Sequence, residues 1–76
     1  MNYLDGRKVL LGDLVDLGGG MSGVVVAVID DGAYASGISA KEWEYLGQGV
    51  LLDAPGFGLV HYLNAEHDFI LARRGR

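Results

Sequence analysis

A glycine-rich reversal between two apolar segments constrains this fold more than any other feature of the chain. Residues 14–17 read Leu-Val-Asp-Leu, and residues 24–29 form the continuous apolar run VVVAVI. Between them stand three consecutive glycines, followed by Met21, Ser22 and Gly23. Short apolar runs joined by residues that tolerate positive φ predict a β-hairpin. The continuous run further predicts a strand that is buried on nearly every side chain.

Turn signals divide most of the remaining sequence into short strands. Asp5-Gly6 predicts a tight hairpin near the N-terminus, Gly12-Asp13 predicts a second turn, and Pro55-Gly56 predicts a third. The strands expected around these turns cover residues 2–4, 7–11, 49–53, 59–63 and 68–73. Together with the central hairpin they predict a mainly β, antiparallel barrel of five to six strands, with residues 1–76 forming a single domain.

One segment has the pattern of a helix instead. Ser39 is followed three residues later by Glu42, which is the capping-box pattern, and Gly47 is a helix-ending residue. We therefore expect one short inserted helix from about Ala40 to Leu46. A helix this short must dock on the sheet to be stable. The side chains expected to face the sheet are those of Ile38, Trp43 and Leu46.

The chain is acidic in its middle and basic at its ends. The net charge is −4 overall, but residues 9–72 carry nine carboxylates against the single base Lys41. An acidic body repels phosphate and attracts basic proteins. The charge therefore argues against nucleic acid and favours a basic protein partner. Acids that only keep a small apolar domain soluble are the alternative.

The residues that enzymes use are sparse in this sequence. There is no cysteine and no threonine, and Ser39 is explained as a helix cap. His61 and His67 have no third metal ligand at a known spacing, and the glycine-rich loop lacks the Lys-Ser/Thr ending of a phosphate loop. Carboxylates at Asp30, Asp31 and Asp53 do not follow EF-hand spacing. We expect a binding protein, not an enzyme, with no cofactor and no metal.

The sequence also bears on location. No apolar run approaches the roughly 18 residues of a membrane span, and no basic region precedes an apolar block at the N-terminus. The lack of cysteine fits a reducing compartment. We expect a cytoplasmic protein that does not contact membranes.

The helical segment supplies a candidate binding surface. Aromatic residues flanked by acids, in the order Glu42-Trp43-Glu44-Tyr45, suit an interface hot spot for a basic partner. Alternatively, Trp43 anchors the helix in the core while the acids are merely solvated, and both interpretations can hold together. The complete set of expected partner-binding residues is Asp30, Asp31, Glu42, Trp43, Glu44 and Tyr45.

The apolar runs carry a further indication. Residues 24–29 and 59–62 alternate poorly, whereas a small sheet ordinarily has one solvated face. Either the fold covers both faces, or some apolar surface contacts a partner or a second copy, as in a homodimer. We favour the second explanation because the chain is small.

The first hairpin resembles a known fold. Gly12-Asp13, Val15 and Leu17, followed by the glycine-rich turn and GVVVAV, resemble the SH3-like barrel and its KOW-type variants. The resemblance implies a small SH3-like barrel. KOW-type domains contact RNA or protein through basic loops, whereas this hairpin and its end carry acids and no base. Those acids are Asp13, Asp16, Asp30 and Asp31.

The size, charge and build of the chain are similar to those of small bacterial immunity proteins, which neutralise interbacterial toxins. That resemblance implies an inhibitor that occludes the active site of a basic partner with an acidic face. One alternative is a KOW-like module that binds RNA or ribosomal or transcription proteins through the basic tail, residues 73–76. Another alternative is a self-associating structural protein.

Overall fold

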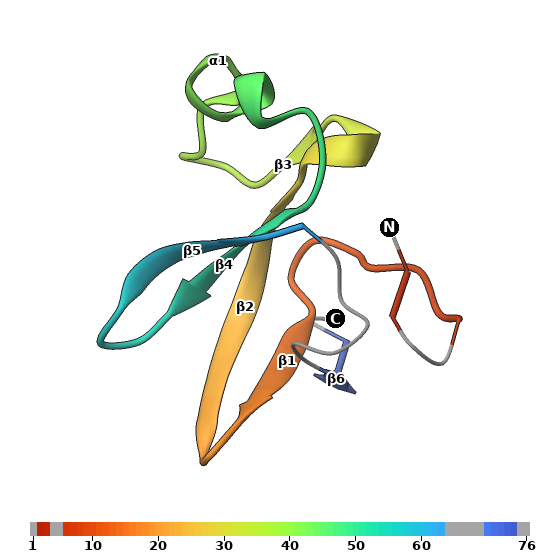
Figure 1. The fold of residues 1–76 in the computed structure, drawn as a ribbon, viewed down its shortest axis with the longest axis vertical. Helices are drawn as coiled ribbons and strands as arrows, with labels where there is room; N and C mark the ends of the chain where they lie inside the picture. Colours follow the sequence, from red (N-terminus) through yellow and green to blue (C-terminus); the bar gives the residue numbers. More distant parts are fainter. Residues whose placement is uncertain (1, 4–5, 64–69, 75–76) are drawn as a thin grey trace.

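The computed structural model describes residues 2–3, 6–63 and 70–74, and its strands form one antiparallel sheet (Figure 1). Neighbouring strands follow the order β5-β4-β2-β1-β6, and β3 pairs with β2 beside this path. The predicted mainly β, antiparallel, barrel-like fold with one short inserted helix is confirmed. In chain order the elements are β1 (Leu14–Gly18), β2 (Met21–Val28), the 3₁₀ turn η1 (Ile29–Asp31), β3 (Ala33–Tyr34), α1 (Ala40–Trp43), the 3₁₀ turn η2 (Glu44–Leu46), β4 (Val50–Ala54), β5 (Gly58–Tyr62) and β6 (Ile70–Arg73).

The central hairpin is tighter than the sequence suggested. Gly18 pairs with Met21, so Gly19 and Gly20 alone make the reversal. Their φ angles of 62° and 81° are both positive, as a type I′ turn requires. Residues 21–23, which we expected in the loop, therefore belong to β2.

A bulge in β2 explains why its sequence alternates poorly. Val25 pairs with Leu52 and Ala27 pairs with Leu51, which leaves Val26 as an extra residue. The extra residue shifts the alternation, so Val25 and Val28 pack in one core cluster and Ala27 packs in another. This part of β2 is buried on both faces of the sheet.

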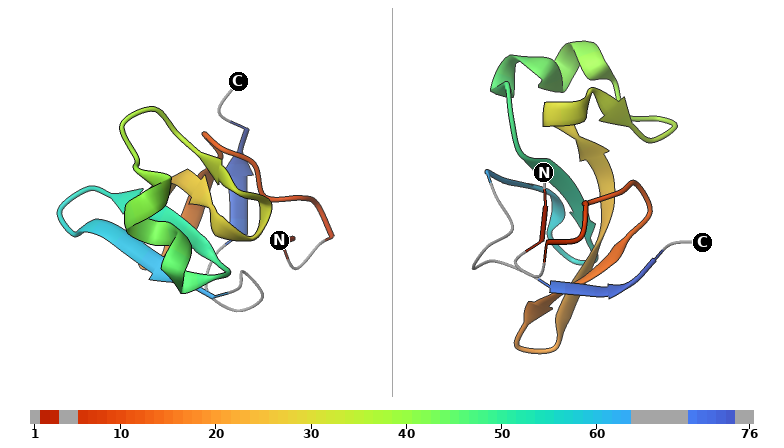
Figure 2. Two further views of the ribbon diagram at one scale, coloured as in Figure 1. Left: turned by 90° about the horizontal axis from the view of Figure 1, so that it is seen from above. Right: turned by 90° about the vertical axis from the view of Figure 1, so that its right-hand side faces the viewer.

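Different segments cover the two faces. One cluster is closed by the N-terminal segment, through Tyr3 and Val9, and by Leu71 of β6. The other cluster, around Ala27 and Leu51, is covered by the helical region (Figure 2). The side chains that this region contributes include Ile38, Trp43 and Leu46, which confirms the inward set predicted from the sequence.

The helical segment, which we define as residues 40–46, begins and ends where the sequence predicted. Its first part is α-helix and its last part is 3₁₀-helix, and Gly47 ends it at φ 77°. Ser39 occupies the N-cap position, but its side chain makes no capping hydrogen bond. The backbone N–H of Glu42 instead donates to the carbonyl oxygen of Ser39 at 3.1 Å.

Several boundaries differ from the prediction. In the described part of the N-terminal hairpin, Asn2 and Lys8 form an isolated bridge, and the Tyr3 N–H donates to the Arg7 carbonyl oxygen at 2.8 Å. The short strand β3 was not predicted. It forms because Gly32, at φ 67°, reverses the chain so that β3 pairs back on β2. The predicted connection at residues 64–67 and the first two residues of the last predicted strand lie outside the described residues.

Candidate protein-binding surface

The helical segment turns one aromatic side chain inward and displays the other. Trp43 is half-buried and packs against the cluster of Ala27 and Leu51. Tyr45 is 76% exposed, and Glu42 and Glu44 are exposed as well. The predicted anchoring role of Trp43 is therefore confirmed, while the other three residues face solvent.

The 3₁₀ turn η1 places two more acids at the same end of the molecule, away from the β1–β2 turn (Figure 1). Asp30 is exposed, and one of its carboxylate oxygens accepts a hydrogen bond from the backbone N–H of Gly49. Asp31 lies 3.6 Å from the Lys8 ammonium in an exposed ion pair, which contributes little to stability. We call this surface the acidic end and define it as Asp30, Asp31, Glu42, Glu44 and Tyr45.

Gly49 fixes the acidic end to the sheet. Its carbonyl oxygen accepts from the Ile29 N–H at 2.8 Å, and its own N–H donates to Asp30, so η1 is held at two points. Gly49 has φ 104°, and a Cβ there would collide with the carbonyl oxygen of Tyr62. The position therefore requires glycine. Sequence reasoning missed this role, since Gly49 was assigned simply to the start of a strand.

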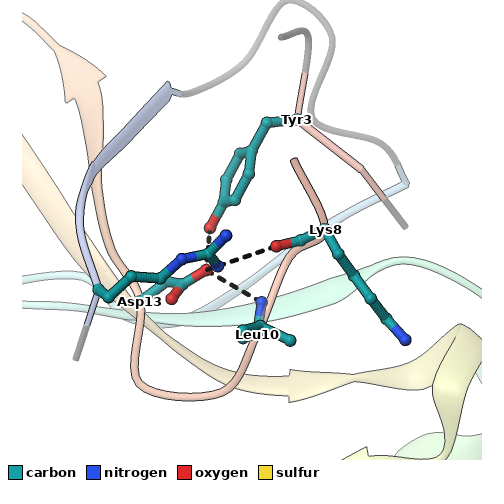
Figure 3. Close-up of polar contacts among 5 residues, drawn as sticks. Tyr3, Lys8, Leu10 and Asp13 are labelled. Atoms are coloured by element: carbon teal, nitrogen blue, oxygen red, sulfur yellow. Dashed lines mark hydrogen bonds and ion pairs between the residues drawn. The ribbon is translucent and has the colours of Figure 1, made fainter. Parts of the chain in front are cut away.

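Asp13 is not a surface acid but the centre of a buried network (Figure 3). The residue is 1% exposed, and its Oδ2 accepts three hydrogen bonds. The donors are the Tyr3 hydroxyl at 2.7 Å, the Leu10 backbone N–H at 2.9 Å and Arg74 Nη1 at 2.8 Å. Arg74 Nη1 also donates to the Lys8 carbonyl oxygen at 2.9 Å. The network joins the N-terminal segment to the residue that follows β6.

Two consequences follow from this network. Burial raises the pKa of the Tyr3 phenol well above its ordinary value, and the hydrogen bond to Asp13 raises this pKa further. The network also engages the charges of Asp13 and Arg74, so Asp13 is not an acid available to a partner and Arg74 is not a base available to one. The Gly-Asp turn that drew attention in the sequence thus has a structural role.

A second exposed surface lies on the half of one sheet face that the helical segment leaves uncovered. Cross-strand pairing aligns residues of five strands in one row, and directly paired side chains share a face. A second row lies beside it. We call this surface the open sheet face; its residues are Leu59, Asp53, Val24, Leu14 and Arg73 in the first row, and Ser22, Asp16 and Ile70 in the second.

The structure places only some of the residues that the sequence offered for catalysis or metal binding. His61 is half-buried, with Nε2 3.0 Å from the Gln48 carbonyl oxygen, and His67 lies outside the described residues. Within those residues, no three or more histidine and carboxylate side chains are grouped to hold a metal ion. The β1–β2 turn borders an open hollow whose one charged lining residue is Asp16, which does not suit phosphate.

None of the helices in residues 2–3, 6–63 and 70–74 is both long and apolar enough to cross a membrane. Comparison with protein-family models, with curated proteins and with solved structures finds no match to this chain.

Proposed function

We propose that this protein binds a basic partner protein through the acidic end and acts by covering the partner's functional surface, as an immunity-type inhibitor does. The observation that carries the proposal is Tyr45. Its side chain is 76% exposed, next to exposed Glu44, on a segment whose other large apolar side chains face the sheet. Exposed aromatic anchors surrounded by charge are typical of interface hot spots.

The acidic end is also held in place before any partner arrives. Trp43 and Leu46 pack the helical segment against the sheet, and Gly49 ties η1 to the start of β4. A rigid surface loses little conformational entropy on binding, which favours affinity. Carboxylates around Tyr45 attract a basic protein and orient its approach.

The RNA-binding alternative loses part of its support. That alternative depended on the basic tail, but Arg74 donates to Asp13 and to the Lys8 carbonyl oxygen. Arg73 is exposed, and residues 75–76 lie outside the described part of the chain. A cytoplasmic location for the complex stays a prediction from the sequence.

Affinity capture from the native host tests the proposal. The wild-type protein should retain a basic protein at low salt and release it at high salt, because exposed ion pairs are screened. Tyr45→Ala should reduce the retained amount at least about fivefold. Recovery of RNA or ribosomal proteins would contradict the proposal and support the KOW-like alternative.

A matched control separates specific contact from net charge. One double variant combines Glu42→Lys with Glu44→Lys at the acidic end. Its control combines Asp16→Lys with Asp53→Lys on the open sheet face and changes the net charge by the same amount. We expect only the first pair to abolish capture. Equal losses from both pairs would show that the overall field, and not the acidic end, retains the partner.

A further inference from the structure

We propose that the open sheet face joins two copies of this chain face to face about a two-fold axis. This inference is independent of the proposed function, because the acidic end lies elsewhere on the molecule. Three strand residues of the face are large, apolar and substantially exposed: Val24 at 37%, Leu59 at 42% and Ile70 at 60%. Solvated faces of antiparallel sheets usually carry polar side chains at such positions, so these residues indicate a contact surface.

The first row of the face is complementary to itself. Val24 stands in its middle strand, with the acid Asp53 on the β4 side and the base Arg73 on the β6 side. A two-fold axis that runs between Val24 and Leu14, parallel to the strands, places Val24 of one copy against Leu14 of the second copy. Asp53 on β4 and Arg73 on β6 lie at equal distances on either side of this axis, so Asp53 of one copy meets Arg73 of the other twice in each dimer.

Asp53 and Arg73 lack this partner within one chain. Strands β2 and β1 lie between β4 and β6, which separates the two residues by about 14 Å across the sheet. Neither side chain forms an ion pair with any described residue. A uniformly basic partner would be repelled by Arg73, and a uniformly acidic one by Asp16 and Asp53. A second copy matches the mixed charge.

The size of the face sets the expected affinity. Stable interfaces use roughly 20–30 residues on each side, whereas the open sheet face has eight. We therefore expect a weak dimer that exchanges with monomer in the micromolar to millimolar range.

Sedimentation velocity of the full chain from about 10 μM to about 1 mM tests the proposal. The mean mass should rise with concentration from 8.1 kDa toward twice that value. Val24→Glu should weaken association at least about tenfold, because a carboxylate then faces the apolar side chain of Leu14 next to the axis. Leu10→Glu is the matched control, since Leu10 is 45% exposed and lies off the face; it should leave the dimer unchanged.

A charge swap tests the predicted pairing of Asp53 with Arg73, and recovery in the double variant shows that the single variants were folded. Asp53→Arg and Arg73→Asp should each weaken the dimer, and the double variant should restore it to within about threefold of wild type. A wild-type chain that stays monomeric at about 1 mM overturns the proposal, as does a dimer that Val24→Glu leaves intact. A double variant no better than the singles refutes the two-fold arrangement. If the chain stays monomeric and Val24→Glu abolishes its capture of a basic protein, the open sheet face binds that protein and not a second copy.

Discussion

Replacing Tyr3 with phenylalanine removes one donor from the buried network and leaves the aromatic ring in the core. The Tyr3 hydroxyl donates to Asp13 Oδ2 at 2.7 Å, and the Tyr3 side chain packs with Val9 and Val15. Hydrogen bonds to a charged group contribute about 1.5–3 kcal/mol. Asp13 keeps Leu10 and Arg74 as donors, so we expect a loss near the lower limit, about 1.5–2 kcal/mol.

That loss is large for a chain of this size. A stability of 0.05–0.15 kcal/mol per residue corresponds to about 4–11 kcal/mol for the whole chain. With an m-value of about 1 kcal/mol/M, the midpoint of urea unfolding should fall by about 1.5–2 M. Trp43 is half-buried in the folded chain, so its fluorescence should report the transition.

The effect should also depend on pH in a defined direction. The unfolded phenol has a pKa of 10.0, and the folded one is higher. Below pH 10 both states hold the proton, and the hydroxyl contributes its full stabilisation. Above pH 10 the unfolded chain releases the proton first, so this contribution falls by about 1.4 kcal/mol per pH unit.

The variant lacks this group, so wild type and variant should converge in stability near pH 11. Urea midpoints measured from pH 7 to pH 11 check both statements. A midpoint shift smaller than about 0.5 M at neutral pH, or curves that stay parallel above pH 10, would refute the proposed role of Tyr3.

Three pairs of substitutions test the supports of the acidic end. Gly49→Ala should destabilise by more than about 3 kcal/mol because its Cβ collides with Tyr62, whereas Gly37→Ala, at φ 89° in open space, should cost only about 1–2 kcal/mol. Equal losses in urea unfolding would contradict the predicted collision. Asp30→Ala should lower stability by about 1 kcal/mol because it removes the hydrogen bond from the Gly49 N–H, whereas Asp31→Ala should lower it by less than about 0.5 kcal/mol. A larger loss of thermal stability for Asp31→Ala than for Asp30→Ala would contradict the role given to Asp30. Trp43→Ala should destabilise by about 2–3 kcal/mol and Tyr45→Ala by less than about 0.5 kcal/mol. A calorimetric loss above about 1 kcal/mol for Tyr45→Ala would mean that its side chain supports the fold.

Local signals predicted much of the fold. Glycines at Gly19, Gly20 and Gly32 adopt positive φ where the chain turns, and the helical segment ends at Gly47. The inward and outward residues of that segment also followed from their spacing, because a helix presents fixed faces. These features depend on residues that are close together in the sequence.

Long-range contacts limited the prediction elsewhere. The bulge at Val26 exists only because β4 pairs with β2, and no local pattern marks it. Asp13 was interpreted as a turn residue and counted with the other acids of the chain, because its partners Tyr3 and Arg74 lie near opposite ends of the sequence. For the same reason no local pattern marks the open sheet face, which combines residues from five strands.

The most direct test of the central claim is the salt dependence of affinity between this protein and the basic protein it captures. We expect binding to weaken steeply between about 50 mM and 500 mM salt, with a flatter dependence for the Glu42→Lys and Glu44→Lys double variant. The double variant should also bind at least about tenfold more weakly at low salt. An affinity and a salt dependence unchanged by both substitutions would contradict binding through the acidic end.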